Sequence, residues 1–225
     1  MITKYGYDVF FTIAAVCVVL LLLALLLIEP KSYRYSIIAV SLAVLGFAVN
    51  FFRDPERRAP KGENFILAPA DGKIIAIKKI FDTEYFHADV WQVSIFMSPL
   101  NVHVNRNPIT GVVKHTRYVP GNYFAAFEDK ASEKNEQMIV GLESTNGKVL
   151  MKQIAGFIAR RIVCPLKLGD TVQAGERFGM IKFGSRVDVF LPLSVDVRSK
   201  IGDVTIAGET IMGVFPGIGL EKISK

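Results

Sequence analysis

Residues 183–191 have the sequence Phe-Gly-Ser-Arg-Val-Asp-Val-Phe-Leu, and this stretch indicates the fold more clearly than any other. From position 186 on, side chains alternate with a period of two, which is typical of a half-buried β-strand. The two faces are Val187, Val189 and Leu191 against Arg186, Asp188 and Phe190. We therefore expect one face of this strand to pack on a core and the other to meet water.

Similar short runs between Gly, Pro and Asp turns fill the rest of residues 53–225 and predict further strands. The clearest are Lys73–Lys78, Val93–Met97, Gln137–Glu143 and Lys148–Ile154. Only residues 122–137 look non-strand, as a polar loop or short helix, and no long amphipathic helix is visible. We predict one mainly β domain over residues 53–225, a β-rich sandwich or barrel.

One segment of this domain has a pattern of its own. Leu168–Ile181 resembles the hairpin of biotinyl and lipoyl carrier domains. Those domains carry a lysine at a tight turn, whereas the turn that follows here is Lys182-Phe-Gly-Ser185. We therefore expect a carrier-like hairpin element without the carrier function's lysine signature.

Residues 1–52 contain two apolar runs that predict a membrane-associated helical hairpin. Val9–Ile28 has 20 residues without a charge and Tyr35–Phe52 has 18, with a short polar turn between them. A helix of about 20 residues spans roughly 30 Å, the thickness of a bilayer core. The first run is long for a signal peptide, lacks a small-residue cleavage site and is followed at once by the second run, so we expect it to be retained. Two interfacial helices would leave the same pattern.

Basic residues favour one orientation of this hairpin. The turn holds Lys31 and Arg34, whereas a larger set follows the second run. That set is Arg53, Arg57, Arg58, Lys61, Lys73, Lys78 and Lys79. The positive-inside rule then places residues 53–225 on the cytoplasmic face of the cell membrane.

Composition narrows the class of protein. The 225 residues are 51% hydrophobic and 21% charged, which is too apolar for an ordinary soluble domain and excludes intrinsic disorder. Two cysteines exclude a disulfide scaffold and a four-cysteine zinc site, and three histidines argue against a multi-histidine metal centre. The net charge of +6 suits an anionic membrane surface or a nucleic acid and does not choose between them. No nucleic-acid partner is expected, because the aromatic residues are not interleaved with Lys and Arg.

Gly184-Ser185 is the pair with the most chemical potential. A Gly-Ser pair alone is usually a turn. Between two apolar strands it also fits a self-processing site, because glycine permits strained backbone angles and the serine hydroxyl lies beside the preceding carbonyl. Asp71, in Ala68-Pro-Ala-Asp-Gly72, and His103, in a segment from Phe96 to Pro108, are further polar candidates.

Taken together, these segments resemble phosphatidylserine decarboxylases, from about Phe51 to the C-terminus. The resemblance is carried by five ordered segments besides the Phe-Gly-Ser-Arg site. They are Phe52-Arg-Asp-Pro-Glu-Arg57, Pro69-Ala-Asp-Gly72, Ser98-Pro-Leu-Asn-Val-His-Val-Asn-Arg106, Tyr118-Val-Pro-Gly121 and Lys130-Ala-Ser-Glu-Lys-Asn-Glu136. The short form of the family, with an N-terminal hydrophobic hairpin, is the closer match, since the longer form usually has Leu-Gly-Ser-Thr at the site.

The resemblance implies a pyruvoyl-dependent enzyme that cleaves itself. Ser185 would become a covalent pyruvoyl group at the start of a small α chain, residues 185–225, which stays with the large β chain, residues 1–184. Phosphatidylserine would form a Schiff base with this group and lose CO2 to give phosphatidylethanolamine. No metal and no PLP are implied, and a homo-oligomer is compatible with the sequence.

The family also implies roles for three other residues. Gly184 is the cleavage partner, His103 is an acid or base near the pyruvoyl group, and Asp71 orients or assists the base in processing. The longer form has a second histidine three positions after the first, where this chain has Arg106. Arginine is not a base near neutral pH. Either His103 serves both steps or another group such as His115 helps, and Arg106 becomes a candidate for binding the substrate carboxylate or phosphate.

Two other functions remain open on the residues alone. Ser185, His103 and Asp71 could form the triad of a membrane-tethered serine hydrolase, although no Gly-x-Ser-x-Gly motif is present. A non-catalytic, carrier-like β module is the other alternative.

Overall fold

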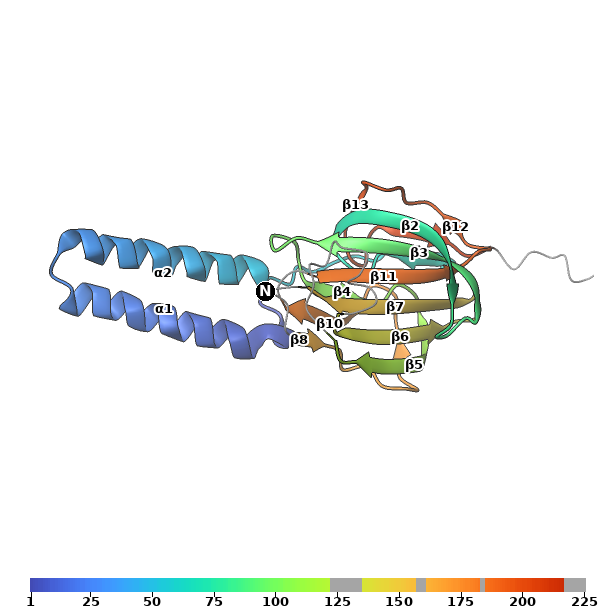
Figure 1. Ribbon diagram of the computed structural model, residues 1–225, viewed down its shortest axis with the longest axis horizontal. Coiled ribbons are helices and arrows are strands. Elements are labelled where there is room, and N and C mark those ends of the chain that lie inside the picture. The colour runs from blue at the N-terminus through green and yellow to red at the C-terminus, as the bar shows by residue number, and fades with distance from the viewer. Residues whose placement is uncertain (122–134, 157–160, 183–184, 217–225) are drawn as a thin grey trace, which may run out of the picture. The chain divides into compact units, whose positions relative to one another are not determined.

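The computed structural model describes residues 1–121, 135–156, 161–182 and 185–216. The chain divides into two compact units, Met1–Pro55 and Glu56–Lys225. The first unit is helical and the second is β-rich, which confirms the predicted fold class (Figure 1). Most of the stretch expected to be a polar loop or short helix, 122–137, lies outside the described residues.

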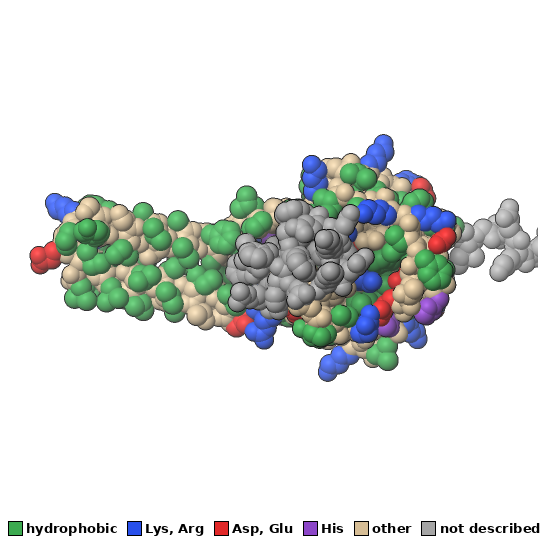
Figure 2. Space-filling model, in the orientation of Figure 1, with side chains coloured by type: hydrophobic (Ala, Val, Ile, Leu, Met, Phe, Trp, Pro, Cys, Tyr) green, Lys and Arg blue, Asp and Glu red, His purple; other side chains and the backbone are tan. Residues whose placement is uncertain are grey.

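The first unit is a hairpin of two apolar helices. Its elements are η1 (Lys4–Gly6), α1 (Tyr7–Leu27) and α2 (Lys31–Phe51). The two helical segments have mean hydropathies of 3.2 and 1.6, and both are long and apolar enough to cross a bilayer. Hydrophobic side chains lie exposed along the visible face of both helices (Figure 2), which is consistent with membrane association.

Helix α2 begins four residues earlier than the apolar run suggests. Pro30 takes the N-cap position, so Lys31 to Arg34 form the first turn of the helix instead of a loop. The Arg34 Nε donates to the carbonyl oxygen of Ile28 at the end of α1, at 2.8 Å. This bond satisfies a helix-terminal acceptor. Because α2 begins at Lys31, the connection between the helices is shorter than the sequence predicts.

The second unit consists of short strands. Their bounds are β1 (Phe65–Leu67), β2 (Gly72–Asp82), β3 (Ala88–Met97), β4 (Val104–Arg106), β5 (Gly111–Val119), β6 (Gln137–Glu143), β7 (Lys148–Ala155), β8 (Arg161–Val163), β9 (Thr171–Val172), β10 (Arg177–Lys182), β11 (Ser185–Pro192), β12 (Asp196–Val197), β13 (Val204–Thr205) and β14 (Ile211–Val214). The predicted strands are all present, and β2 and β3 are longer than predicted.

Eight of these strands form a curled antiparallel sheet (Figure 1). Their order is β13-β2-β3-β11-β7-β6-β5-β9. Two smaller sheets have the orders β1-β14-β12 and β4-β10-β8. Strand β11 comes late in the sequence yet lies between β3 and β7, so the segment that begins with Ser185 is central to the sheet.

Both faces of β11 are buried, so the predicted half-buried strand is wrong in one respect. Val187, Val189 and Leu191 join the main core, as expected. Arg186 and Asp188 on the other face are also buried and pair with each other, with Nε 2.6 Å from Oδ1. The Oγ of Ser94 accepts from Arg186 Nη2 at 2.7 Å.

Gln92 completes this buried polar cluster. Its Nε2 donates to Asp188 Oδ2 at 2.9 Å. Buried charges are tolerated where partners and hydrogen bonds satisfy them, and here both charged groups have such partners. The polar alternation in the sequence therefore marks an internal ion pair and not a wet face.

The carrier-like segment forms a corner between two sheets. Strand β9 pairs with β5 in the large sheet, whereas β10 pairs with β4 and β8 in a small one. Gly175, with φ of 81°, makes the turn between β9 and β10. Asn107 pairs with this turn, since its carbonyl accepts from Gly175 N at 2.8 Å and its N–H donates to Glu176 O at 2.8 Å. The strands expected to form a hairpin thus pair with other strands.

The buried ion pair gives a stability prediction. We expect Asp188→Ala to lower the free energy of unfolding by about 3–5 kcal/mol, because it leaves the Arg186 charge buried without its partner. Urea unfolding of the full chain in detergent micelles measures this loss.

The exposed pair between Arg198 Nε and Asp196 Oδ2, at 2.8 Å, supplies the control. Asp196→Ala should cost no more than about 1 kcal/mol. The double variant Arg186→Met with Asp188→Leu, which removes both charges, should recover most of the loss. Equal small effects at positions 188 and 196 would contradict a role for the buried pair.

Candidate functional site

Ser185 is the first residue of the central strand. It pairs with Met97 of β3 on one side and with Ala155 of β7 on the other. Its side chain is fully buried, and its hydroxyl lies 3.2 Å from the Met97 sulfur. Gly184, the predicted cleavage partner, lies outside the described residues. The described part of the site therefore begins at Ser185, which lies beside Met97, the last residue of β3.

Asp71 lies at the same end of the sheet. Lys73 pairs with Phe96, the neighbour of Met97, so the segment before β2 and the start of β11 flank one end of β3. Gly72 permits this packing, because a Cβ there would lie 2.2 Å from the Phe96 carbonyl oxygen. The sequence therefore needs glycine directly after Asp71.

The Asp71 carboxylate is held at both oxygens. Oδ1 accepts from the backbone N–H of Ala207 at 2.8 Å, and Oδ2 accepts from Arg57 Nη2 at 2.9 Å. Arg57 also approaches Glu209, at 3.5 Å. In the sequence Arg57 belongs only to the basic stretch after the second apolar run and to the first family segment, and neither predicts its contact with Asp71. Its presence in that ordered segment was the one sign that could have suggested a role.

His103 is fully buried just before β4. Its Nδ1 lies 3.0 Å from the carbonyl oxygen of Asn101. A carbonyl oxygen only accepts, so the neutral ring carries its proton on Nδ1 and its basic lone pair on Nε2. The His103 carbonyl accepts from Ile181 N at 3.4 Å, which places this histidine beside the end of β10, four residues before Ser185 in the sequence.

Asn105 links these segments. Its Nδ2 donates to the Pro69 carbonyl at 3.3 Å and approaches the Met97 sulfur at 3.9 Å. Its Oδ1 accepts from Gln153 Nε2 at 2.8 Å. All of these residues are buried, and the sequence alone predicts no role for Asn105. The network fixes the histidine segment against both the Asp71 segment and the neighbour of Ser185.

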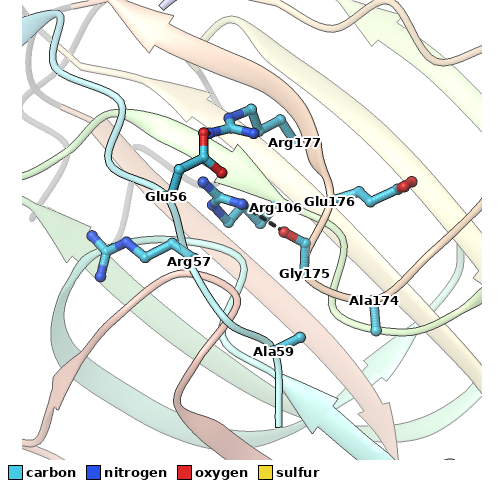
Figure 3. A pocket seen from close by; sticks show the side chains of 8 residues that line it. All are labelled: Glu56, Arg57, Ala59, Arg106, Ala174, Gly175, Glu176 and Arg177. Atoms are coloured by element: carbon cyan, nitrogen blue, oxygen red, sulfur yellow. Dashed lines mark hydrogen bonds and ion pairs between the residues drawn. The ribbon is translucent and has the colours of Figure 1, made fainter. Parts of the chain in front are cut away.

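Arg106 lines a cavity of about 400 Å³ that Arg57 also lines (Figure 3). Its buried guanidinium donates from Nη1 to the Gly175 carbonyl at 2.8 Å. The cavity is lined by Glu56, Arg57, Ala59, Arg106, Ala174, Gly175, Glu176 and Arg177. In Figure 3 the Glu56 carboxylate lies against Arg177, with which it forms an ion pair of 2.8 Å. The Arg57 guanidinium points away from Arg106, and it pairs with Asp71.

His115 is not brought to this site. It lies on β5, three strands from β11, and its Nε2 is 2.9 Å from Glu84 Oε1. Burial raises the pKa of Glu84, but the hydrogen bonds from Arg117 and His115 outweigh it, and the pKa of the carboxyl falls below its usual value. The geometry gives no support to His115 as a helper at Ser185.

The arrangement disfavours a serine-hydrolase triad. A triad needs the aspartate to accept from Nδ1 of the histidine. Here Nδ1 of His103 faces Asn101, and both Asp71 oxygens accept from Arg57 and Ala207. Within the described parts of the chain, no group of three His, Cys, Asp or Glu side chains could hold a metal ion.

Comparisons with known proteins point to one family. Residues 44–213 match the family model of phosphatidylserine decarboxylase. A phosphatidylserine decarboxylase proenzyme of Chlorobium phaeobacteroides is 48% identical over 215 residues, which cover 96% of this chain and 100% of the relative. Proteins of the same name are 49% identical over 183 residues in Chlorobium luteolum (81% and 86% covered) and 46% over 192 in Salinibacter ruber (84% and 85%).

Proposed function

The chain belongs to the phosphatidylserine decarboxylase family, and from this we propose that it decarboxylates phosphatidylserine to phosphatidylethanolamine after cleaving itself at Ser185. The observation that carries the proposal is the place of Ser185. It begins the central strand of the sheet, and the segments of His103 and Asp71 meet at its end of β3.

Self-cleavage would use the Ser185 hydroxyl as nucleophile. Oγ attacks the Gly184 carbonyl carbon and loses its proton, and the C–N bond breaks to give an ester. Removal of the Ser185 α-proton and elimination break the Cβ–Oγ bond, which releases the Gly184 carboxylate and a dehydroalanine. Hydrolysis of that residue with loss of ammonia leaves a pyruvoyl group. The products are a β chain, residues 1–184, and an α chain, residues 185–225.

His103 and Asp71 are the residues that we assign to proton transfer. The Nε2 lone pair of His103 suits a base in processing and an acid or base in turnover. Asp71 is held by Arg57 and Ala207 N, so we assign it a fixed negative charge that orients or assists the base during processing. With Arg106 in place of the second histidine of the longer form, His103 is our candidate for both steps.

The surroundings of Ser185 fit a pyruvoyl group in its place. The position is buried and flanked by Met97 and Ala155, and a pyruvoyl group is no larger than the serine residue that it replaces. When formed, this covalent group supplies the electron sink that decarboxylation of an amino acid requires. The backbone ladder on both sides of β11 would hold it.

Arg106 is our candidate for the anionic part of the substrate. Its guanidinium lines the cavity beside Arg57 and Arg177, and such groups bind carboxylate or phosphate in a planar fork. The hydrogen bond to Gly175 fixes the position of the guanidinium. The cavity lies next to the Arg57–Asp71 pair, which supports a substrate role for Arg106.

The apolar hairpin suits a substrate that stays in the bilayer. We propose that the protein resides in the cell membrane with its β-rich unit on the cytoplasmic face, as the basic residues after α2 favour. Arg57 also forms an ion pair inside the second unit, so the stretch 53–61 does not act only as a topology determinant.

The first test of the proposed function is the intact mass of the purified protein beside that of Ser185→Ala. We expect two wild-type chains, broken between residues 184 and 185, with a pyruvoyl group at the start of the smaller one. Ser185→Ala should remain one chain without decarboxylase activity. A folded wild-type protein that stays intact with an unmodified serine would overturn the proposal.

Separate variants should divide processing from turnover. We expect Asp71→Asn to slow self-cleavage by about 100-fold or more, because it removes the charge that Arg57 and Ala207 N hold in place. His103→Ala should also lower the turnover of whatever fraction is processed, by about 10²–10⁴-fold. Gel quantification of the chains and CO2 release per pyruvoyl group measure the two effects. Wild-type rates in both variants would argue against these roles.

Arg106→His tests the substrate-binding role. We expect a KM for phosphatidylserine raised by about tenfold or more with the fraction of cleaved chain unchanged, since imidazole lacks the bidentate fork. Arg106→Lys should give an intermediate KM. Unaltered processing together with unaltered KM and kcat in Arg106→His would argue against an anion-binding role.

A further inference from the structure

Strand β13 forms one edge of the large sheet and presents apolar side chains to the outside. Thr205 faces inward, where its Oγ1 donates to the Ala70 carbonyl at 2.9 Å. Val204 and Ile206 alternate with it and are 71% and 40% exposed, and Ile201 in the preceding turn is 64% exposed. Natural sheet edges are usually protected by charged side chains or proline. β13 is short, Val204–Thr205, yet Val204 and the flanking Ile201 and Ile206 leave three aliphatic side chains exposed at this edge.

The backbone holds these side chains outward in a defined turn. Gly202 N donates to the Ile74 carbonyl at 2.8 Å, and Ile74 N donates to the Asp203 carbonyl at 2.9 Å. Gly202 has φ of 97°, which only glycine adopts readily, and the Asp203 carboxylate accepts from Lys200 N at 2.7 Å. The apolar residues are therefore presented by an ordered turn, so little conformational entropy is lost when they bind.

This edge adjoins the candidate site. Thr205 pairs with Gly72, and Ala207 N donates to Asp71. The turn after β3 adds another apolar side chain at the same end of the sheet, since Leu100 is 68% exposed and lies three residues after Met97. Exposed apolar groups therefore occur on two elements next to the end of β3 where Ser185 begins its strand.

The charges beside the edge are mainly positive. Lys73, which pairs with Val204, and Lys200, which precedes Ile201, are both exposed, while Asp203 is the acidic member. Aliphatic groups flanked by lysines fit the headgroup boundary of an anionic bilayer, where the apolar groups insert and the ammonium groups stay among phosphates. A purely apolar protein partner would give the lysines no counterion.

We propose that Ile201, Val204 and Ile206, flanked by Lys73 and Lys200, are a lipid-docking surface that holds the site end of the sheet against an anionic bilayer. The proposal rests on the proposed function, because a diacyl substrate reaches the site only from the membrane. It adds a contact made by the β-rich unit itself, separate from the apolar hairpin. We call these five residues the β13 surface.

Fluorescence of a labelled β13 surface tests the contact without any need for activity. Val204→Cys is made in a chain that carries Cys17→Ala and Ser185→Ala, and is labelled with an environment-sensitive nitrobenzoxadiazole dye. Burial raises the pKa of the Cys164 thiol to about 11, so at neutral pH the dye reacts with the new thiol. Emission is compared in detergent micelles and in vesicles of phosphatidylcholine with phosphatidylglycerol.

Leu168→Cys supplies the matched control, because Leu168 is 67% exposed, follows a lysine and lies near β9 at the opposite edge of the sheet. We expect emission from position 204 to shift to shorter wavelength in anionic vesicles and emission from position 168 to stay unchanged. Equal shifts or no shift would overturn the proposal. A shift in micelles that grows with protein concentration would also overturn it, since a second copy of the chain would then cover the edge.

Kinetics test what the contact does. We expect Val204→Asp to raise the KM for phosphatidylserine in anionic vesicles by about tenfold, as for the loss of one buried aliphatic side chain, while Leu168→Asp leaves it unchanged. Self-cleavage of the Val204→Asp variant should match the wild type. With the protein in detergent micelles, its turnover of a dissolved, monomeric short-chain phosphatidylserine should also match the wild type. An unchanged KM in Val204→Asp would overturn the docking surface alone, whereas a wild-type protein inactive on both substrates would overturn the proposed function.

Discussion

The burial of β11 on both faces is the constraint on which the rest of the β-rich unit depends. Backbone ladders to β3 and β7 begin at Ser185 itself, and the Arg186–Asp188 pair follows within the next three residues. If the bond before Ser185 breaks as proposed, the new terminus has no covalent neighbour on that side. The two ladders and the buried ion pair then keep its first residues in register, so the reactive group would be positioned by the sheet as well as by its bond to Arg186.

A second buried charge joins distant segments at the same end of the sheet. The Asp71 carboxylate is largely removed from water, and such a charge is stable only with a partner. Arg57 supplies that partner from the start of the second unit, and Ala207 supplies a backbone donor from beyond β13. Asp71 is thereby placed by residues 14 and 136 positions away. A site assembled in this way uses charge pairing to locate a carboxylate at the end of the sheet where Ser185 begins its strand.

The sequence predicted the strands well because alternation reports which residues share a face. It did not reveal that the face of Arg186 and Asp188 is covered, since a period of two is the same whether a polar face meets water or a buried partner. The partners of each strand were harder to predict from the sequence than the strands themselves. Leu168–Ile181 has the local pattern of a hairpin, yet Gly175 and Asn107 turn its two strands into different sheets. Local pattern sets the strand, whereas tertiary contacts choose its neighbour.

The same difference between local sequence pattern and tertiary contact applies to the site residues. Ser185, His103 and Asp71 were named from segments whose order along the chain is informative, and the structure brings those segments to one end of β3. Arg57, Met97 and Asn105 act only through contacts across 14 to 88 positions, which no periodicity encodes. The exposure of the aliphatic residues in the β13 surface is likewise not visible in the sequence, because the sequence does not show which strand lies at a sheet edge. An edge that would invite aggregation in water is stable against lipid, so the chemistry of the substrate and the exposure of the edge have one physical explanation.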